Sequence, residues 1–323
     1  MTKPKIFVTR QWPAAVEAQL TALYDVTLNT TDRPLSADEF KAALQNYDAV
    51  CPTVCDSFPA EVINVANKRC KILGNFGVGY NHIDINAAKQ AGIMVTNTPG
   101  VLTESTADIA MTLLLMSARR GAEGDRIVRA KQWHGWCPTH MLSTDVTGAS
   151  LGLIGFGRIA QAMARKAHHG FGMHIHYYNP SPADASIVAD LNAVRYDSIE
   201  ALMGSADFIS LHCPGGAETK HLINAERLSL MKTSAHLINT ARGDVVDSQA
   251  LINALNSKQI AGAGLDVYEG EPNIHAGFLD LDNVTLLPHL GSATLNTRTA
   301  MGEKVLANLA AFFSGKEPPD RVR

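Results

Sequence analysis

Three polar side chains of different chemistry each follow an apolar stretch in the last third of the chain. Arg242 follows the stretch AHLINTA, Glu271 lies in YEGEP just after IAGAGLDV, and His289 follows VTLLP. If these stretches are parallel strands, their carboxyl ends lie at one edge of a sheet, where open sheets bind ligands. A guanidinium binds anions, and an imidazole exchanges protons near neutral pH. The spacing therefore brings a guanidinium, a carboxylate and an imidazole to one place.

A glycine-containing segment, Leu151–Ala160 (LGLIGFGRIA), has the pattern of a buried strand, a tight turn and a helix start. Gly155 permits a turn that a side chain would block, Gly157 lets the backbone approach a pyrophosphate, and Ala160 lets the helix pack on the strand. Free N–H groups at the helix start bind phosphates. The pattern alone is weak, because glycine turns also occur for local reasons. A second strand, MHIHYYN, ends at Asn179, where a ribose-reading residue belongs, and this favours a dinucleotide site.

Each of the three polar residues also has an ordinary structural explanation. A single histidine after an apolar strand is usually structural, Arg242 could be a solvated turn residue, and Glu271 could belong to a charged loop. The combination favours a functional site, because three complementary groups converge beside a predicted nucleotide.

The other histidines and the cysteines do not predict a metal site. His174 and His176 share one face of a strand, but no acidic residue or cysteine stands nearby in sequence. The five cysteines have no CxxC spacing, and Cys51 with Cys55 alone makes a poor zinc site. We expect buried, reduced thiols, as in a cytoplasmic protein.

The composition limits the kinds of partner. A length of 323 residues suggests two domains, and a formal charge of −3 gives no electrostatic reason to bind nucleic acid or an anionic membrane. No apolar run is long enough to span a bilayer, and the chain enters a strand directly without a signal-peptide pattern. We therefore expect a cytoplasmic protein.

The first hundred residues alternate between short apolar strands and helices, which predicts a parallel sheet covered on both faces. The expected strands are KIFVTR, YDVTLN, DAVCPT, KILGNF and IMVTNT, and the expected helices lie near residues 13–23, 36–45, 59–66 and 83–91.

Pro99-Gly100 breaks this alternation, and a strongly apolar helix is expected from about Thr103 to Arg120. Ser105 and Asp108 have capping-box spacing near its start. Such a helix must pack against another domain or another subunit. A polar loop at residues 129–148 follows and contains Trp133 and Trp136. It is either pinned by its aromatic side chains or is an arm that reaches a partner or the active-site cleft.

A second alternating series begins at Leu151, and its six strands match a dinucleotide-binding domain. A final helix is expected from about Thr294 to Phe313, with Gly315 as its stop, free to pack back on the first domain. The six strands are LGLIGF, MHIHYYN, DFISLHC, AHLINTA, IAGAGLDV and VTLLPHL, with helices near residues 159–169, 198–203, 224–231 and 247–256.

Taken together, these motifs resemble the D-isomer-specific 2-hydroxyacid dehydrogenase family. The likeness runs over nearly the whole chain in the right order, and the GVGYNHID segment looks most like the glyoxylate and hydroxypyruvate reductase branch. It is carried by NFGVGYNHID, LGLIGFGRIAQAMA, LHCPGGAETKHLINAERLSLMKTSAHLINTARGDVVD, and GLDVYEGEP followed by LLPHLGSAT.

The resemblance implies an α/β fold of two doubly wound parallel-sheet domains. Residues 1–100 plus 291–323 would form a flavodoxin-like substrate domain, into which a Rossmann nucleotide domain, residues 101–290, is inserted. Substrate would lie in the cleft between them. The long helix and the Trp-containing loop would help to build a homodimer.

The resemblance also implies the reaction, which is hydride transfer to the C2 carbonyl of a small 2-oxo acid. Glyoxylate would give glycolate, and hydroxypyruvate would give D-glycerate. His289 would protonate the new alkoxide, Glu271 would orient the imidazole, and Arg242 would hold the substrate carboxylate and polarise the carbonyl. Backbone N–H groups of Val78 and Gly79 would bind the same carboxylate.

The second strand of the nucleotide domain suggests which cofactor is used. An NAD site usually carries Asp or Glu there, whereas this chain has Asn179, Pro180 and Ser181. The absence of a carboxylate favours NADP(H), with NAD(H) possible, although the arginine often used to grip the 2′-phosphate is absent too. The residues expected to bind cofactor are Thr106, Gly155, Gly157, Arg158, Ile159, Asn179, Ser181, Cys213, Pro214, Thr219, Thr240, Ala241, Asp266, His289 and Gly291.

Two alternatives to this function stay open. One is a broader 2-oxo acid reductase that acts on pyruvate or on aromatic 2-oxo acids such as phenylpyruvate. The other is a nucleotide-sensing transcriptional co-regulator, as some members of the wider family are. The full set of Arg242, Glu271 and His289 and the lack of an additional binding module favour an enzyme.

Overall fold

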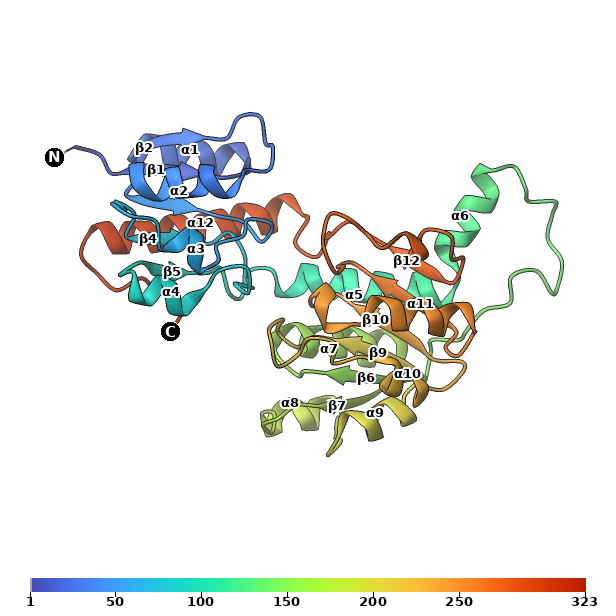
Figure 1. The fold of residues 1–323 in the computed structure, drawn as a ribbon. Coiled ribbons are helices and arrows are strands. Elements are labelled where there is room, and N and C mark those ends of the chain that lie inside the picture. The colour runs from blue at the N-terminus through green and yellow to red at the C-terminus, as the bar shows by residue number, and fades with distance from the viewer. Residues whose placement is uncertain (1) are drawn as a thin grey trace. The chain divides into compact units, whose positions relative to one another are not determined.

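The computed structural model describes residues 2–323, which form two compact units (Figure 1). The first unit contains the residues up to Leu102 together with Ala293–Arg323, and the second is Thr103–Ser292. The sequence-based boundaries, after Gly100 and after Leu290, lie close to these positions. The chain therefore leaves the first unit once and returns to it at the end.

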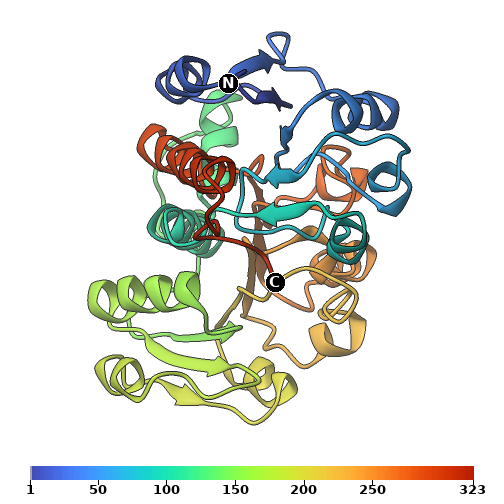
Figure 2. The same cartoon turned by 90° about the vertical axis from the view of Figure 1, so that its left-hand side faces the viewer.

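The first unit is a parallel five-stranded sheet in the order β2-β1-β3-β4-β5, the order of flavodoxin-like folds. Helices α1 and α12 pack on the face that contains Ile6 and Ile72, and α2, α3 and α4 pack on the face that contains Val50 and Leu73 (Figure 2). The strands are β1 (Lys5–Val8), β2 (Asp25–Leu28), β3 (Ala49–Cys51), β4 (Ile72–Gly74) and β5 (Met94–Thr96); the helices are α1 (Ala14–Leu23), α2 (Ala37–Asn46), α3 (Ala60–Ile63), α4 (Ile85–Gln90) and α12 (Leu295–Phe313).

Helix α12 is part of the core of this first unit, although it comes from the end of the chain. Val305 and Leu309 are fully buried in the cluster that also contains Val16 and Leu20 of α1. Gly74 permits the close packing, because a Cβ there would lie 2.9 Å from Cγ1 of Val305. The final helix thus packs back on the first sheet, as the sequence predicted.

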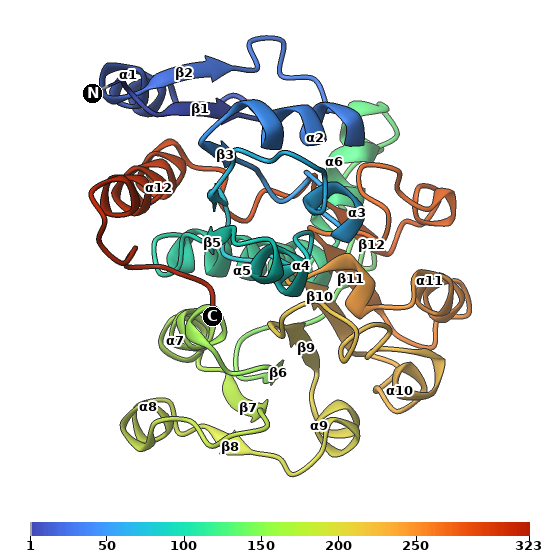
Figure 3. The same cartoon turned by 60° about the vertical axis from the view of Figure 1, so that its left-hand side comes forward.

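The second unit is a parallel seven-stranded sheet in the order β12-β11-β10-β9-β6-β7-β8, the doubly wound order of dinucleotide-binding folds with one strand added. Helices α5 and α7 cover one face, and α9, α10 and α11 cover the other (Figure 3). The strands are β6 (Ser150–Ile154), β7 (His174–Tyr178), β8 (Val194–Arg195), β9 (Phe208–Leu211), β10 (His236–Asn239), β11 (Gly262–Leu265) and β12 (Val284–Leu286). The helices are α5 (Thr103–Ala118), α6 (Gly121–Arg129), α7 (Arg158–Phe171), α8 (Ala185–Asp190), α9 (Ile199–Ser205), α10 (Ala225–Ser229) and α11 (Ser248–Asn256), with 3-10 turns at Gly243–Val245 and Ala276–Phe278.

Several local expectations from the sequence were wrong. The second sheet has seven strands rather than the expected six. The strand that was not predicted is β8, which is only two residues long, and helices α6 and α8 were not expected either. Helix α6 contains two glycines, but ion pairs from Arg120 to Glu123 and from Arg129 to Asp125 support it. Ser105 lies inside α5 rather than at its start, so the expected capping box is absent there.

The loop after α6 projects away from the rest of its unit (Figure 1). Trp133 is 55% exposed and Trp136 is 82% exposed, so these side chains do not pin the loop to its own unit. No disulfide joins the five cysteines, but Cys55 and Cys137 are exposed, contrary to the expectation of buried thiols. Within residues 2–323, no helix has both the length and the apolar character that crossing a membrane requires.

Candidate active site

His289 and Glu271 form a hydrogen-bonded pair at the carboxyl edge of the second sheet. His289 follows β12, Glu271 lies in the loop after β11, and the distance from Nδ1 of the imidazole to Oε2 of the carboxylate is 2.8 Å. Both side chains keep about a third to a quarter of their surface exposed, at 32% and 26%. Because the carboxylate occupies Nδ1, Nε2 is the ring nitrogen that can exchange a proton with a ligand.

Asp266 holds the backbone that presents this imidazole. Its carboxylate accepts hydrogen bonds from the N–H groups of Leu290, at 2.6 Å, and Gly291, at 2.8 Å. Its carbonyl accepts from the N–H of His289 at 2.9 Å. His289 has a φ of +54°, which a non-glycine residue adopts at a cost of about 1–3 kcal/mol. Burial raises the pKa of Asp266, although these N–H groups oppose the shift.

Tyr268 fixes the loop that carries Glu271. Its N–H donates to Oε1 of Glu271 at 2.8 Å. Its hydroxyl oxygen lies 3.1 Å from the carbonyl oxygen of Leu265 and 2.8 Å from that of Leu287, so its single hydrogen is shared between these two acceptors. The phenol therefore connects the end of β11 to the segment that leads to His289. Tyr268 was not predicted to be a site residue, because nothing in the sequence around an aromatic residue in a loop indicates hydrogen bonding to two distant carbonyls.

Arg242 follows β10, in a turn that Asn239 holds. The Asn239 side chain donates to the carbonyl of Arg242 at 2.9 Å and accepts from the N–H of Ala241 at 3.0 Å. Gly215 leaves room for the arginine stem, because a Cβ there would lie 2.7 Å from Cγ of Arg242. Burial lowers the pKa of Arg242, while the charges of Glu271 and Asp244 raise it. Arginine remains protonated in proteins, so the site retains a fixed positive charge.

The electrostatic environment keeps Glu271 ionised. Burial acts to raise the pKa of its carboxyl, but the hydrogen bond and charge of His289, the Tyr268 N–H and the charge of Arg242 together lower that pKa below its ordinary value. The carboxylate is therefore available to accept the imidazole N–H throughout the neutral range. Arg242, Glu271 and His289 thus follow three neighbouring strands, and the charges of Arg242 and His289 act on the Glu271 carboxylate.

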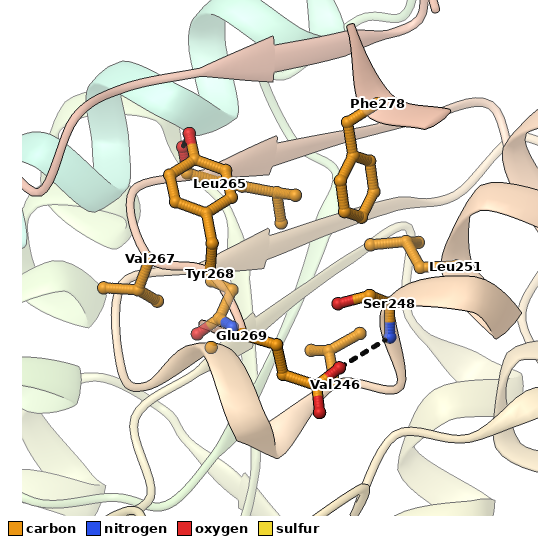
Figure 4. Close-up of a pocket in the computed structure, with 10 residues that line it drawn as sticks. Val246, Ser248, Leu251, Leu265, Val267, Tyr268, Glu269 and Phe278 are labelled. Atoms are coloured by element: carbon orange, nitrogen blue, oxygen red, sulfur yellow. Dashed lines mark hydrogen bonds between the residues drawn. The ribbon is translucent and has the colours of Figure 1, made fainter. Parts of the chain in front are cut away.

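The second carboxylate of the same loop, Glu269, has different partners. Figure 4 shows it directed toward Ser248 in a small pocket beside the loop, where its Oε2 accepts from the Ser248 N–H at 3.4 Å. Its Oε1 is 2.7 Å from Nε2 of His221. A second His–Glu pair, which the sequence analysis did not identify, thus binds this loop to the segment after β9.

The glycine turn after β6 has room for a phosphate. Gly155 has a φ of +84°, and a Cβ there would lie 2.9 Å from the backbone N of Cys213, so this position needs glycine. Apart from Gly157 and its two chain neighbours, no heavy atom of residues 2–323 lies within 4 Å of the Cβ position of Gly157, and no side chain caps the helix α7 that begins beside it. Arg158 and Ile159 are the first residues of that helix. Its N–H groups can therefore receive an anion such as a pyrophosphate.

Other residues predicted to bind cofactor gather around the same strand ends. The Thr106 hydroxyl donates to the carbonyl of Gly291 at 3.1 Å, which places it beside Asp266. The Thr219 hydroxyl donates to the carbonyl of Pro214 at 2.7 Å in the loop after β9. Thr240 has a buried hydroxyl without a hydrogen-bond partner among the described residues, which a bound ligand could satisfy.

Asn179, which the sequence places among the expected cofactor-binding residues, makes hydrogen bonds within the protein. Its Oδ1 accepts from the Phe156 N–H at 3.1 Å, and its Nδ2 donates to the carbonyl of Ser181 at 2.8 Å. The side chain therefore braces the glycine turn. Both of its polar atoms already have partners within the protein.

In the first unit, Val78 and Gly79 lie in a loop whose carbonyls are held by asparagines. Nδ2 of Asn75 donates to the carbonyls of Gly77 and Gly79, each at 3.0 Å, and Nδ2 of Asn97 donates to that of Val78 at 2.8 Å. The N–H groups of Val78 and Gly79 make no hydrogen bond to any residue in the described range. They are therefore available to an anion.

Comparison with known proteins identifies the family. The model of the D-isomer specific 2-hydroxyacid dehydrogenase NAD binding domain matches residues 111–291, more than half of the chain. The chain belongs to the D-isomer-specific 2-hydroxyacid dehydrogenase family. The family prediction from sequence is thereby confirmed, as is the fold of two parallel-sheet α/β domains.

Individual relatives agree over the full length of this dehydrogenase. A glyoxylate reductase of Thermococcus onnurineus is 43% identical over 99% of this chain and 96% of its own length. A glycerate dehydrogenase of Hyphomicrobium methylovorum is 37% identical over 98% of each chain. A crystal structure of an NADPH-dependent glyoxylate/hydroxypyruvate reductase of Sinorhizobium meliloti, in complex with NADP and malonate, has a TM-score of 0.88 and 34% identity, covering 99% of this chain and 97% of that one.

The lowered pKa of Glu271 predicts a pH-dependent contribution to stability. This contribution is present above the ordinary carboxyl pKa of 4.5 and is lost as the pH falls through the lower folded value. Glu271→Gln removes the titration but keeps the shape. We expect wild type to exceed this variant in free energy of unfolding at pH 7, by a margin that shrinks below about pH 4.5. Urea denaturation between pH 7 and 3 measures the margin, with exposed Glu303→Gln as the control; a constant margin would contradict the prediction.

Proposed function

We propose that this dehydrogenase reduces glyoxylate to glycolate and hydroxypyruvate to D-glycerate, with NADPH as the preferred reductant and NADH as a possible one. The observation that carries the proposal is the 2.8 Å hydrogen bond between His289 and Glu271, beside the fixed charge of Arg242. A small acid with a neighbouring carbonyl group matches this arrangement, because it needs one cation and one proton donor. The names of the glyoxylate reductase and glycerate dehydrogenase relatives support the same substrates.

In the proposed mechanism, Arg242 binds the substrate carboxylate and polarises the carbonyl through its planar guanidinium. That backbone N–H groups of Val78 and Gly79 also bind this carboxylate stays an expectation from the family resemblance. A nicotinamide cofactor, when bound, would supply the hydride. Nε2 of His289 gives its proton to the carbonyl oxygen, and Glu271 keeps the ring in position through Nδ1.

The cofactor would be held by the turn at Gly155 and Gly157, by the start of α7, and by the residues around Asp266 and Thr240. The second strand of the unit ends without a carboxylate at Asn179 to Ser181, which supports use of NADP(H) because no negative charge there repels a 2′-phosphate. The S. meliloti relative was solved with NADP. That the enzyme works in the cytoplasm stays a prediction from sequence.

The substrate proposal is tested by cofactor oxidation with a panel of 2-oxo acids. Rates are measured with NADPH and with NADH on glyoxylate, hydroxypyruvate, pyruvate and phenylpyruvate. We expect the highest kcat/KM for the first two acids, and a higher value with NADPH than with NADH. Preference for phenylpyruvate would replace the proposed substrates with bulky ones, and an absence of turnover with all four would favour a sensor.

The proton-donor role predicts a large effect of His289→Gln. We expect kcat to fall by about 10²–10⁴-fold, because a positioned general acid contributes that much, in protein that still unfolds cooperatively on heating. His174→Gln, at an exposed position of β7, serves as the matched control. Near-normal kcat in folded His289→Gln protein would refute the role.

We also propose a homodimer in which the exposed loop after α6 contacts the partner. The support for this proposal is that one loop carries three exposed large apolar side chains, Trp133, Trp136 and Leu142, which are 55%, 82% and 70% exposed. Light scattering should give twice the 34.7 kDa chain mass. Replacing Trp136 and Leu142 with serine should yield monomers, whereas Leu295→Ser, an equally exposed position elsewhere, should not. A monomeric wild type would exclude the proposal.

A further inference from the structure

A cation lies at the end of β7, where the sequence analysis found none. Strand β8 runs parallel to β7 with Arg195 opposite Tyr177. From there the side chain reaches the turn after β7, and its Nη2 donates to the carbonyls of Asn179 at 3.0 Å and Pro180 at 3.2 Å. An arginine sixteen positions later in the chain thus supplies the positive charge that was missing beside Asn179.

The guanidinium retains donors for a ligand. Both bonds to the turn use Nη2, and Nε and Nη1 have no hydrogen-bond partner within residues 2–323. Arg195 is exposed to solvent. The two carbonyls hold the planar group at the turn, which reduces the conformational freedom that ligand binding would otherwise remove. The site is therefore partly organised before a ligand arrives.

The surrounding groups do not neutralise this charge directly. Asp184 is the acidic residue closest in sequence to the turn, and its Oδ1 accepts from the Ser186 N–H and hydroxyl at 2.8 and 2.6 Å as the cap of α8. The Asn179 amide is used by Phe156 and Ser181. Arg195 is thus the group at this turn with both a charge and uncommitted donors.

We propose that Arg195 binds the 2′-phosphate of NADP(H) and determines the preference for this cofactor. The ribose of a bound dinucleotide lies at the end of the second strand of such a sheet, which here is the turn that Arg195 contacts. A guanidinium binds phosphate through short, charge-assisted hydrogen bonds in a fixed planar geometry. The inference rests on the proposed preference for NADPH and assigns that preference to a residue.

The test compares ligands that differ only in the 2′-phosphate. Dissociation constants for NADPH, NADH, 2′,5′-ADP and 5′-AMP are measured by calorimetry on full-length wild type and on Arg195→Gln. We expect the variant to lose roughly 10- to 100-fold in affinity for the two phosphorylated ligands, as expected for hydrogen bonds to a charged group. The affinity for NADH and 5′-AMP should change by less than about twofold, because these ligands carry no 2′-phosphate for Arg195 to bind.

Two further variants separate phosphate binding from a general effect. Arg195→Lys keeps the charge without the planar fork and should retain part of the preference. Arg165→Gln removes a positive charge from an exposed position within α7, seven residues after the start of that helix, and should leave all four affinities unchanged. A thermal unfolding curve for each variant shows whether the protein is folded.

The possible failures are distinguishable. If wild type prefers NADPH and Arg195→Gln keeps the same preference, the assignment to Arg195 is wrong while the proposed cofactor stands. If Arg195→Gln weakens the binding of NADH as much as the binding of NADPH, Arg195 only supports the turn and the inference is again overturned. If wild type binds both cofactors equally, the preference and the inference fail together, but the 2-oxo acid reductase activity is judged separately by the substrate panel.

Discussion

The buried carboxylate of Asp266 organises the carboxyl edge of the second sheet. It accepts hydrogen bonds from the N–H groups of Leu290 and Gly291, and the backbone carbonyl of Asp266 accepts a hydrogen bond from the N–H of His289. These bonds maintain the left-handed conformation of His289, from which the imidazole reaches Glu271. A carboxylate can do this while buried because hydrogen bonds from the protein replace its lost water. The geometry of the proton-exchanging pair therefore depends on an aspartate that is not one of its two members.

Long-range placement of the main groups could be predicted from the sequence, because it follows from topology. Apolar strands alternating with helices imply a parallel sheet, and in such a sheet the residues after each strand lie at one edge. Arg242, Glu271 and His289 satisfied this rule. The glycine turn was equally predictable, since the required φ at Gly155 and the open space at Gly157 depend on local chain geometry.

The features that escaped prediction depend on contacts between distant segments or on very short elements. Strand β8 has two residues and shows no periodicity, so Arg195 could not be placed beside Asn179 from its neighbours in sequence. The bonds of the Asn179 amide to Phe156 and Ser181 could not be predicted either, because they depend on how the glycine turn meets the end of β7. Helix α6 was hidden by its glycines, and the charge pairs that support it become visible only once the helix exists.

The position of α12 determines the order in which the two units can be completed during synthesis. The helix supplies Val305 and Leu309 to the core of the first unit, yet the ribosome makes it after all of Thr103–Ser292. Because the second unit precedes α12 in the sequence, all of its strands and helices are synthesised before α12 emerges. Domains generally fold as units during synthesis, so the second unit can fold at that stage. Until then the first sheet exposes the apolar face that α12 covers. The core of the first unit, which begins the chain, can therefore be completed only after the whole of the second unit has been synthesised.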